Sequence, residues 1–306
     1  MSSTFTILGL GEALFDIFPD RSVLGGAPLN CALCAHQLGQ VHGGRTAVVS
    51  RLGQDELAQR AIGELAQHGM DTRYLQSDPD YPTGKVYVTV DEQGEPGYEI
   101  VEGAAWDWMQ WDTDLDELAL HCEALCFSGL CQRNNQSRST VQRFVAQAKQ
   151  AIRMFDLTLR QHYYDQRMLK RSCELATVVK LNIEELDILA GEVSLGGQSV
   201  NERAADLIKR YDLTHVVVTQ GKAGTIIFTP SNCYAGDPGN PVHYPPQENA
   251  DSVGAGDACS AAILVGLVLR LPVATIVELA NHAGAYVASV AGATPTLPDE
   301  ILDRFG

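Results

Sequence analysis

The segment 251–257 carries residue types suited to phosphoryl transfer. Its glycines, Gly254 and Gly256, flank Ala255 and precede a long apolar run that predicts a helix. Glycines at that position let backbone N–H groups face outward together, and a helix N-terminus adds partial positive charge. Asp257 could accept the proton of a hydroxyl that attacks a phosphoryl group held there. The alternative is a tight turn in which Asp257 caps the helix.

Residues nearer the N-terminus could hold a sugar. Gly25 and Gly26 permit close approach of the backbone to a ligand, and Asn30 offers both a donor and an acceptor. Asp16, at the end of an extension of the first strand, could accept hydrogen bonds from two sugar hydroxyls. Each of these features, taken alone, is more often a turn or a helix cap.

Two later segments are suited to a nucleotide and its metal ion. Asn182 and Glu185 follow an apolar run three residues apart, so their side chains can share one face and hold Mg²⁺ through water. The run 219–224 follows another apolar run and contains two glycines, which is typical of a loop around nucleotide phosphates.

The predicted elements that position these residues alternate between strand and helix. Short apolar runs are separated by segments with helical spacing, which favours a parallel sheet flanked by helices. Without an internal repeat or a linker, residues 1–306 are predicted to form a single α/β domain. Strands are predicted at 6–10, 47–52, 124–128, 154–159, 176–181, 215–219 and 225–228, and helices at 27–38, 56–68, 139–152, 257–269 and 273–291.

Residues 82–105 depart from this alternation. The run 85–91 alternates apolar and polar residues, a turn is predicted at 92–97, and residues 98–102 form the return strand. We expect an antiparallel hairpin with one face in water, inserted into the domain. Such an insertion commonly serves as a lid over a ligand or as a contact in a homodimer.

Composition and charge limit the classes of function. The 306 residues include 22 Lys and Arg against 38 Asp and Glu, a net charge of −16. This acidity disfavours binding to nucleic acid and to anionic membranes. The chain begins without the basic region of a signal peptide, and no run approaches the roughly 18 apolar residues of a membrane span. The eight cysteines are scattered, and Cys31 and Cys34 lie in an apolar helix, which predicts core thiols in a cytoplasmic protein.

In their order along the chain these motifs resemble those of the ribokinase-like (PfkB) family of carbohydrate kinases. The run GGAPLN at 25–30 is similar to the family's N-terminal Gly-Gly signature. DSVGAGD at 251–257 is similar to its C-terminal DTxGAGD signature, with Ser252 in place of Thr, and NIEE at 182–185 stands at the expected distance before it. The resemblance covers nearly the whole chain. It implies a three-layer α/β/α sandwich with a mainly parallel central sheet and a small β lid over the sugar.

The resemblance also implies roles for individual residues in an ATP-dependent sugar kinase. Asp257 would be the catalytic base, and the amides of Gly254, Ala255 and Gly256 the anion hole. Asp16, Gly25, Gly26 and Asn30 would hold the sugar. Asn182, Thr219, Gly221, Gly224 and Asn281 would line the ATP site, Glu185 together with Asn182 would organise Mg²⁺, and Asp251 and Val253 would contact a monovalent cation such as K⁺.

Further runs are similar to those of bacterial fructokinases, among them 82–85, 102–107 and 127–133. Residues 155–160 resemble a stretch that usually reads Asp-x-Asn-x-Arg, so Arg160 would reach the substrate, but Thr158 stands where Asn is usual. The expected acceptor is therefore O6 of fructose. Ribose, 2-keto-3-deoxygluconate and nucleosides stay alternatives, as does a non-catalytic sugar or nucleotide sensor. Because the chain is acidic, a phosphate site of this kind would depend on backbone amides and a divalent cation.

Overall fold

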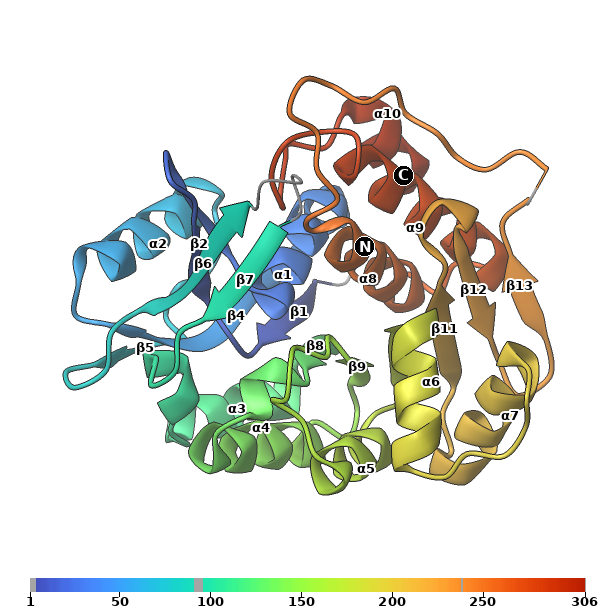
Figure 1. The fold of residues 1–306 in the computed structure, drawn as a ribbon, viewed down its shortest axis with the longest axis horizontal. Helices are drawn as coiled ribbons and strands as arrows, with labels where there is room; N and C mark the ends of the chain where they lie inside the picture. The colour runs from blue at the N-terminus through green and yellow to red at the C-terminus, as the bar shows by residue number, and fades with distance from the viewer. Residues whose placement is uncertain (1–3, 91–95, 238, 306) are drawn as a thin grey trace.

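The computed structural model describes residues 4–90, 96–237 and 239–305. Within these residues the larger sheet has nine strands in the order β13-β12-β11-β10-β9-β8-β1-β4-β5 (Figure 1). The strands from β5 across to β11 pair in parallel, whereas β12 and β13 are antiparallel. The predicted α/β fold with a mainly parallel central sheet is confirmed. The strands are β1 (Phe5–Leu10), β4 (Gly44–Gly53), β5 (Leu75–Asp78), β8 (Ala124–Ser128), β9 (Ile152–Asp156), β10 (Val178–Asn182), β11 (His215–Thr219), β12 (Thr225–Phe228) and β13 (Cys233–Ala235).

Helices cover both faces of this sheet (Figure 1). Successive side chains of a strand point to opposite faces, so Leu8 of β1 packs with one helix layer and Ile7 with the other. The first layer contains α3 (Thr113–His121), α4 (Asn135–Gln147), α5 (Gln166–Leu175), α6 (Ile183–Glu192) and α7 (Val200–Tyr211). The second contains α1 (Ala27–Gly39), α8 (Ala255–Val268), α9 (Val273–Val287) and α10 (Asp299–Leu302), while α2 (Glu56–Gln67) packs on β4 and α1 at the end of the sheet.

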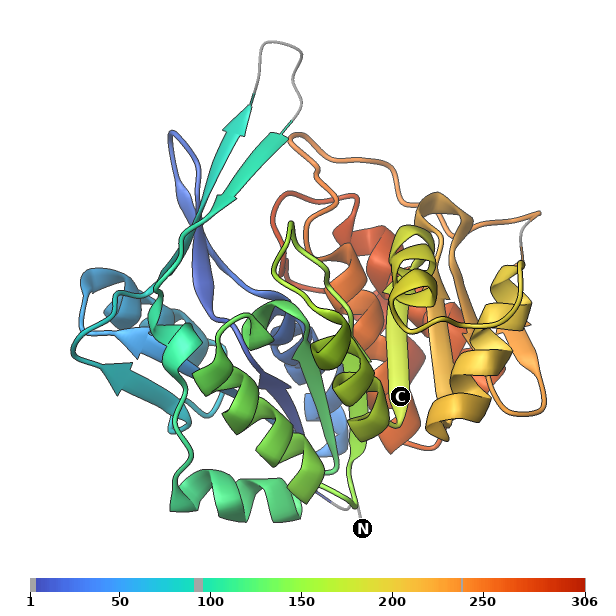
Figure 2. The same ribbon diagram turned by 60° about the horizontal axis from the view of Figure 1, so that its bottom comes forward.

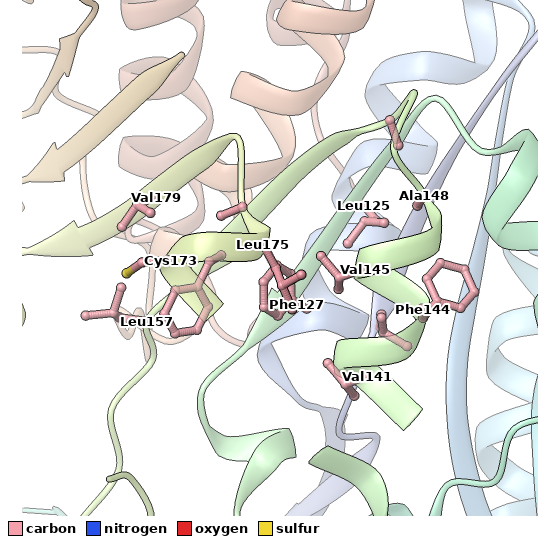
Figure 3. Close-up of a cluster of buried hydrophobic side chains, with 14 of the residues drawn as sticks. Leu125, Phe127, Val141, Phe144, Val145, Ala148, Leu157, Cys173, Leu175 and Val179 are labelled. Atoms are coloured by element: carbon pink, nitrogen blue, oxygen red, sulfur yellow. The ribbon is translucent and has the colours of Figure 1, made fainter. Parts of the chain in front are cut away.

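The core of the first layer fixes the strands that end at the site. Figure 3 shows Leu125 and Phe127 of β8 facing Val145 of α4. The rings of Phe127 and Phe155 stack with centroids 5.1 Å apart, which joins β8 to β9. Aromatic side chains of this size contribute much of the apolar area that a core buries. The polar residues that follow these strands are therefore carried on rigid elements.

A second sheet of four strands, in the order β3-β2-β6-β7, stands at the end of the molecule where α2 packs. Figure 2 shows β6 and β7 rising beyond the body. The prediction of a hairpin alone was incomplete, because β2 pairs in parallel with β6 and brings β3 with it. The turn predicted at 92–97 falls largely outside the described residues. The strands are β2 (Leu14–Ile17), β3 (Ser22–Gly25), β6 (Gly84–Val90) and β7 (Pro96–Ile100).

Several predicted boundaries were wrong. The helix expected at 139–152 begins earlier and ends at Gln147, because the chain needs residues 148–151 to turn back into β9. The last long helix ends at Val287 rather than at 291. Helices α3, α5, α6 and α7 and the edge strands β5 and β13 were not predicted. No helix in the described part of the chain is long and apolar enough to cross a membrane.

Candidate active site

The residues predicted to do chemistry gather at the carboxyl ends of the parallel strands. The chain runs from β1 to β4 on one side and later returns to β8 on the other, so the strand order reverses at β1. Ligands of open α/β sheets bind in the crevice at such a reversal. Residues that follow β1, β9, β10 and β11 and those at the start of α8 lie around this edge.

Helix α8 begins with amides that lack a side-chain cap. Its N-cap is Gly254 at φ +78°, and no side-chain cap is present among the described residues. A Cβ on Gly254 would lie 2.0 Å from the carbonyl oxygen of Ala293, so both the backbone conformation and the space require glycine. Asp257 is inside the helix and is not its cap. The alternative of a capped turn is therefore wrong. The Ala255 amide donates to the Ser252 carbonyl oxygen at 3.3 Å, and the amides on either side of it, those of Gly254 and Gly256, can receive an anion.

Asp257 is the carboxyl group at this helix end. The side-chain amide of Asn30 in α1 donates to its Oδ2 at 2.8 Å, across 227 residues of sequence. Burial and the charge of Asp156 raise the pKa of Asp257 to about 6. Lys180, the hydrogen bond from Asn30 and Arg160 act in the opposite direction. A carboxylate with a pKa near neutrality is suited to accept a proton.

The predicted sugar-binding residues lie together beside Asp257. A Cβ on Gly25 would be 3.2 Å from Asp16 Oδ2 and 4.0 Å from Asn30 Oδ1, so these two acceptors flank the glycine. Burial raises the pKa of Asp16 to about 6, with Arg160 opposing and the charges of Asp251 and Asp257 adding to the shift. Gly26, at φ +116°, begins α1 against the backbone of Glu12. Asp16 belongs to β2 of the small sheet, not to an extension of β1.

Glu12 was not predicted as a site residue, yet it is buried between the end of β8 and the start of α1. Ser128 at the end of β8 donates its hydroxyl to Oε2 at 2.6 Å, and the Ala27 amide donates to Oε1 at 3.3 Å. Burial raises the pKa of Glu12 to about 7, against the effect of the Ser128 hydrogen bond. In the sequence, Glu12 is a glutamate shortly after a predicted strand. This pattern does not indicate a site residue until its partners Ser128 and Ala27 are known.

The sequence analysis also missed an ion pair that lies next to the start of α8. Lys180 Nζ and Asp156 Oδ2 are 2.9 Å apart, and both side chains are buried. Burial lowers the pKa of Lys180. The charge of Asp156 and its hydrogen bond, together with smaller effects of nearby groups, raise the pKa by more than burial lowers it, so Lys180 stays a protonated ammonium. A Cβ on Gly256 would lie 3.1 Å from this ammonium.

Asn182 and Glu185 form a reciprocal cap at the start of α6. The Glu185 amide donates to Asn182 Oδ1 at 2.8 Å, and the Asn182 amide donates to Glu185 Oε2 at 2.9 Å. The other oxygen, Oε1, accepts from the Leu159 amide at 3.0 Å, next to Arg160. Because each carboxylate oxygen already accepts a backbone N–H, Glu185 fits a metal ion that it contacts through water.

The predicted nucleotide loop lies farther along the same edge. Thr219 ends β11, and Gly221 and Gly224 follow in left-handed conformations with φ of +55° and +90°. A Cβ on Gly224 would be 3.2 Å from the side-chain amide of Asn281 in α9. The structure therefore brings Asn281 to the glycine loop, as the ATP-site assignment requires. Asn281 Oδ1 is buried and has no hydrogen-bond partner among the described residues.

Comparison with known proteins identifies the family. The sequence profile of the pfkB family carbohydrate kinases matches residues 20–300. This chain belongs to that family. It is 30% identical to a fructokinase of Escherichia coli over 94% of this chain and 95% of the relative, and 29% identical to a fructokinase of Klebsiella pneumoniae over the same shares.

Solved structures agree with this kinase family. A fructokinase from Vibrio cholerae, a double mutant with bound fructose, ADP and potassium ion, is 26% identical, covers 98% of each chain and has a TM-score of 0.79. A fructokinase from Xylella fastidiosa with bound ATP has a TM-score of 0.82 at 22% identity, with 98% of this kinase and 97% of that chain covered, which supports the shared fold. The ribokinase-like fold is thus confirmed, and the family supports phosphorylation of a sugar by ATP.

The remaining predicted ligands of this kinase are held by backbone groups. Asp251 accepts the Val253 amide on Oδ1 at 3.0 Å and the Gly292 amide on Oδ2 at 3.1 Å, which ties the segment 251–254 to the segment after α9. In the described ranges, no group of three or more His, Cys, Asp or Glu could hold a metal ion. Cys31 and Cys34 are buried free thiols, as expected.

Proposed function

We propose that this kinase transfers the γ-phosphoryl group of ATP to O6 of fructose and forms fructose 6-phosphate. One observation carries the proposal: Asp257, with a pKa of about 6, lies at the uncapped start of α8 and beside the sugar-side acceptors Asp16 and Asn30. A base, an anion site and a polyol site are thus adjacent. These are the parts that phosphoryl transfer to an alcohol needs.

Asp257 acts as the base. Asn30 holds Oδ2 of its carboxylate, so the group is oriented before substrate binds and presents its other oxygen to the sugar hydroxyl. As the oxygen of the hydroxyl forms its bond to the γ-phosphorus and the bond to the β-phosphate oxygen breaks, the hydroxyl proton passes to Asp257. Its pKa near neutrality keeps the carboxylate available and makes the proton transfer favourable.

The start of α8 stabilises the transferred group. The amides of Gly254, Ala255 and Gly256 lie at a helix N-terminus, where negative charge is favoured, and the Ala255 amide would exchange its 3.3 Å contact with the Ser252 carbonyl oxygen for the phosphoryl group. Charge on the equatorial oxygens is met by fixed donors that need no reorganisation. Glu185, with Asn182, would hold Mg²⁺ through water beside the nucleotide phosphates. The ion would supply further neutralisation of phosphate charge.

The small sheet is suited to cover the sugar. Asp16 is carried on β2, which pairs with β6 of the projecting hairpin, so one sugar contact belongs to the lid itself. Movement of this sheet toward α8 would exclude water, which otherwise competes with the sugar as acceptor. A monovalent cation at Asp251 and Val253 stays a prediction. The eight free cysteines fit a cytoplasmic location.

The choice of fructose is supported by the curated relatives. Arg160 is exposed and donates to the Leu159 carbonyl oxygen at 3.2 Å, and its charge lowers the pKa of Glu12, Asp16 and Asp257, so a role in binding the sugar stays a prediction. An assay of ADP release with fructose, ribose, 2-keto-3-deoxygluconate and adenosine tests the assignment. We expect the highest kcat/KM with fructose. A higher value with another acceptor would reassign the substrate, and ligand-induced stabilisation without ADP release would indicate a sensor.

Asp257→Asn tests the catalytic role. We expect kcat to fall by about 10²–10⁴-fold, the usual contribution of a general base. The affinities for ATP and fructose, measured by calorimetry, should stay close to those of the wild type, because Asn keeps the shape and an acceptor for Asn30. Near-normal turnover in this variant would refute the assignment of Asp257 as the base.

A further inference from the structure

Lys180 and Asp156 form an ion pair inside the sheet. Their side chains are 8% and 3% exposed, and parallel pairing of β9 with β10 places the two residues directly opposite each other. Taking two charges out of water costs several kcal/mol for each ion, and a well-packed apolar pair is often as stable. Stability alone therefore does not explain why charged residues stand at these positions.

The pair is held on several sides. Ser260 in α8 donates its hydroxyl to Asp156 Oδ2 at 2.8 Å, and Thr158 donates to Asp156 Oδ1 at 3.2 Å. Ser260 Oγ also lies 3.1 Å from the carbonyl oxygen of Gly256. The aspartate thus links β9, β10 and the first turns of α8, and it fixes the ammonium on its side of the helix start.

The ammonium of Lys180 lies behind the anion site. It comes within 3.1 Å of the position that a Cβ on Gly256 would occupy, so it fills the space where another residue would have a side chain. The charges of Lys180 and Asp156 also reach Asp257, where Asp156 raises the pKa and Lys180, with the smaller effect, lowers it. The ammonium is the cation of the pair that lies next to the backbone of Gly256.

We propose that Lys180 is a positioning residue that holds a fixed positive charge behind the Gly254–Gly256 amides, with Asp156 and Ser260 keeping it in place. The charge strengthens the anion site as negative charge spreads over the transferred phosphoryl group. This inference rests on the proposed function. In a chain of net charge −16, Lys180 would then be a buried cation beside the proposed phosphate site.

The decisive experiment compares Lys180→Met with the double variant Lys180→Met/Asp156→Leu. The single variant leaves a buried carboxylate unpaired, so it is expected to lose stability as well as activity. The double variant removes both charges and should regain stability in urea denaturation. We expect its kcat to stay at least about 10²-fold below wild type, the cost of losing one such stabilising group. Recovery of both stability and kcat would show a purely structural pair and overturn the proposal.

Two further variants sharpen the result. Lys180→Arg keeps the charge and should retain more activity than Lys180→Met. Arg51→Met is the matched control, because Arg51 is also a buried cation, 2.6 Å from Asp78, but lies outside the site. It should lose stability and keep kcat. Equal losses of kcat in Arg51→Met and Lys180→Met at matched folded fractions would overturn the proposal.

Measuring the affinity for inorganic phosphate tests the role of Lys180 independently of whether the protein is a sugar kinase. If wild-type protein releases no ADP with any sugar, the proposed function fails while the anion site is still testable. Calorimetry with inorganic phosphate in the presence of ADP should then show at least about tenfold weaker binding in the double variant, a loss of about 1.4 kcal/mol, because the positive charge behind the amides is gone. Equal phosphate affinity in the two proteins would refute the role of Lys180.

Discussion

Glu12→Gln should change how the stability of this kinase depends on pH. Glu12 is 1% exposed, and burial raises its pKa to about 7 from the ordinary value of 4.5 that applies in the unfolded chain. Between these values the native state binds more protons than the unfolded state. The contribution of Glu12 to stability is therefore fully present below 4.5 and is lost as the pH rises through about 7.

The size of the effect follows from the two pKa values. Their difference of 7 − 4.5 = 2.5 corresponds to about 3 kcal/mol, since each unit of pKa is worth about 1.4 kcal/mol. The glutamine side chain of the variant does not titrate. It keeps one acceptor for the Ser128 hydroxyl or the Ala27 amide, and the cost of losing the other is independent of pH. From about pH 5 to about pH 8 the wild type should therefore lose about 2–3 kcal/mol of stability relative to the variant.

Urea denaturation followed by tryptophan fluorescence measures both proteins at each pH. Asp16 and Asp257 also have raised pKa values, but both proteins contain them, so their contributions largely cancel in the difference. The test is how the difference in unfolding free energy between the two proteins changes with pH. The size of that difference at any single pH is not part of the test. Parallel stability curves for the wild type and Glu12→Gln would refute the reasoning that Glu12 titrates near neutrality in the folded protein.

Two further predictions concern backbone positions at the site. Gly254→Ala should lower the free energy of unfolding by more than about 2 kcal/mol and also lower kcat, because the new Cβ would lie 2.0 Å from the carbonyl oxygen of Ala293. Gly292→Ala is the control, because Gly292 has a φ of +90° but no atom within 4 Å of the new Cβ, so the loss should be only about 1 kcal/mol. Thermal denaturation measures both. Equal costs would contradict the steric argument. Thr158 is β-branched at φ +41°, a conformation that Asn tolerates better, so Thr158→Asn should raise the stability by about 1 kcal/mol. A lower melting temperature in that variant would contradict this strain.

The sequence predicts the parts of the site that depend on local patterns. Glycines before an apolar run, and a carboxylate just inside it, predict the start of α8 without knowledge of its neighbours. The same reasoning predicts that polar residues follow several strands, and the parallel sheet then brings them to one edge. Distances such as the one from Asn30 to Asp257 follow once α1 and α8 pack together, and the packing itself depends on apolar faces that the sequence displays.

The residues that were missed depend on register and on long-range pairing. Lys180 stands in a run that predicts a buried strand, and the sequence around it does not indicate which carboxylate would pair with it. Its partner, Asp156, is 24 residues away and becomes its neighbour only through the register of β9 on β10. Strands β2 and β3 were missed for a similar reason. Each has four residues, and β2 joins the hairpin only through its pairing with β6, about 70 residues away, while β3 pairs with β2.

The site combines opposite requirements. Under the proposed function, Asp16 would bind the sugar and Asp257 would act as the base, and both roles need an anionic carboxylate although the nucleotide beside them would be a polyanion. A cluster of surface Lys and Arg would neutralise them and lower their pKa values below the range useful for proton transfer. Amide dipoles at α8 act over a short distance, and Lys180 is already paired with Asp156. The phosphoryl group is thus offered positive charge locally, while Asp257 keeps a pKa of about 6 and its capacity to act as a base.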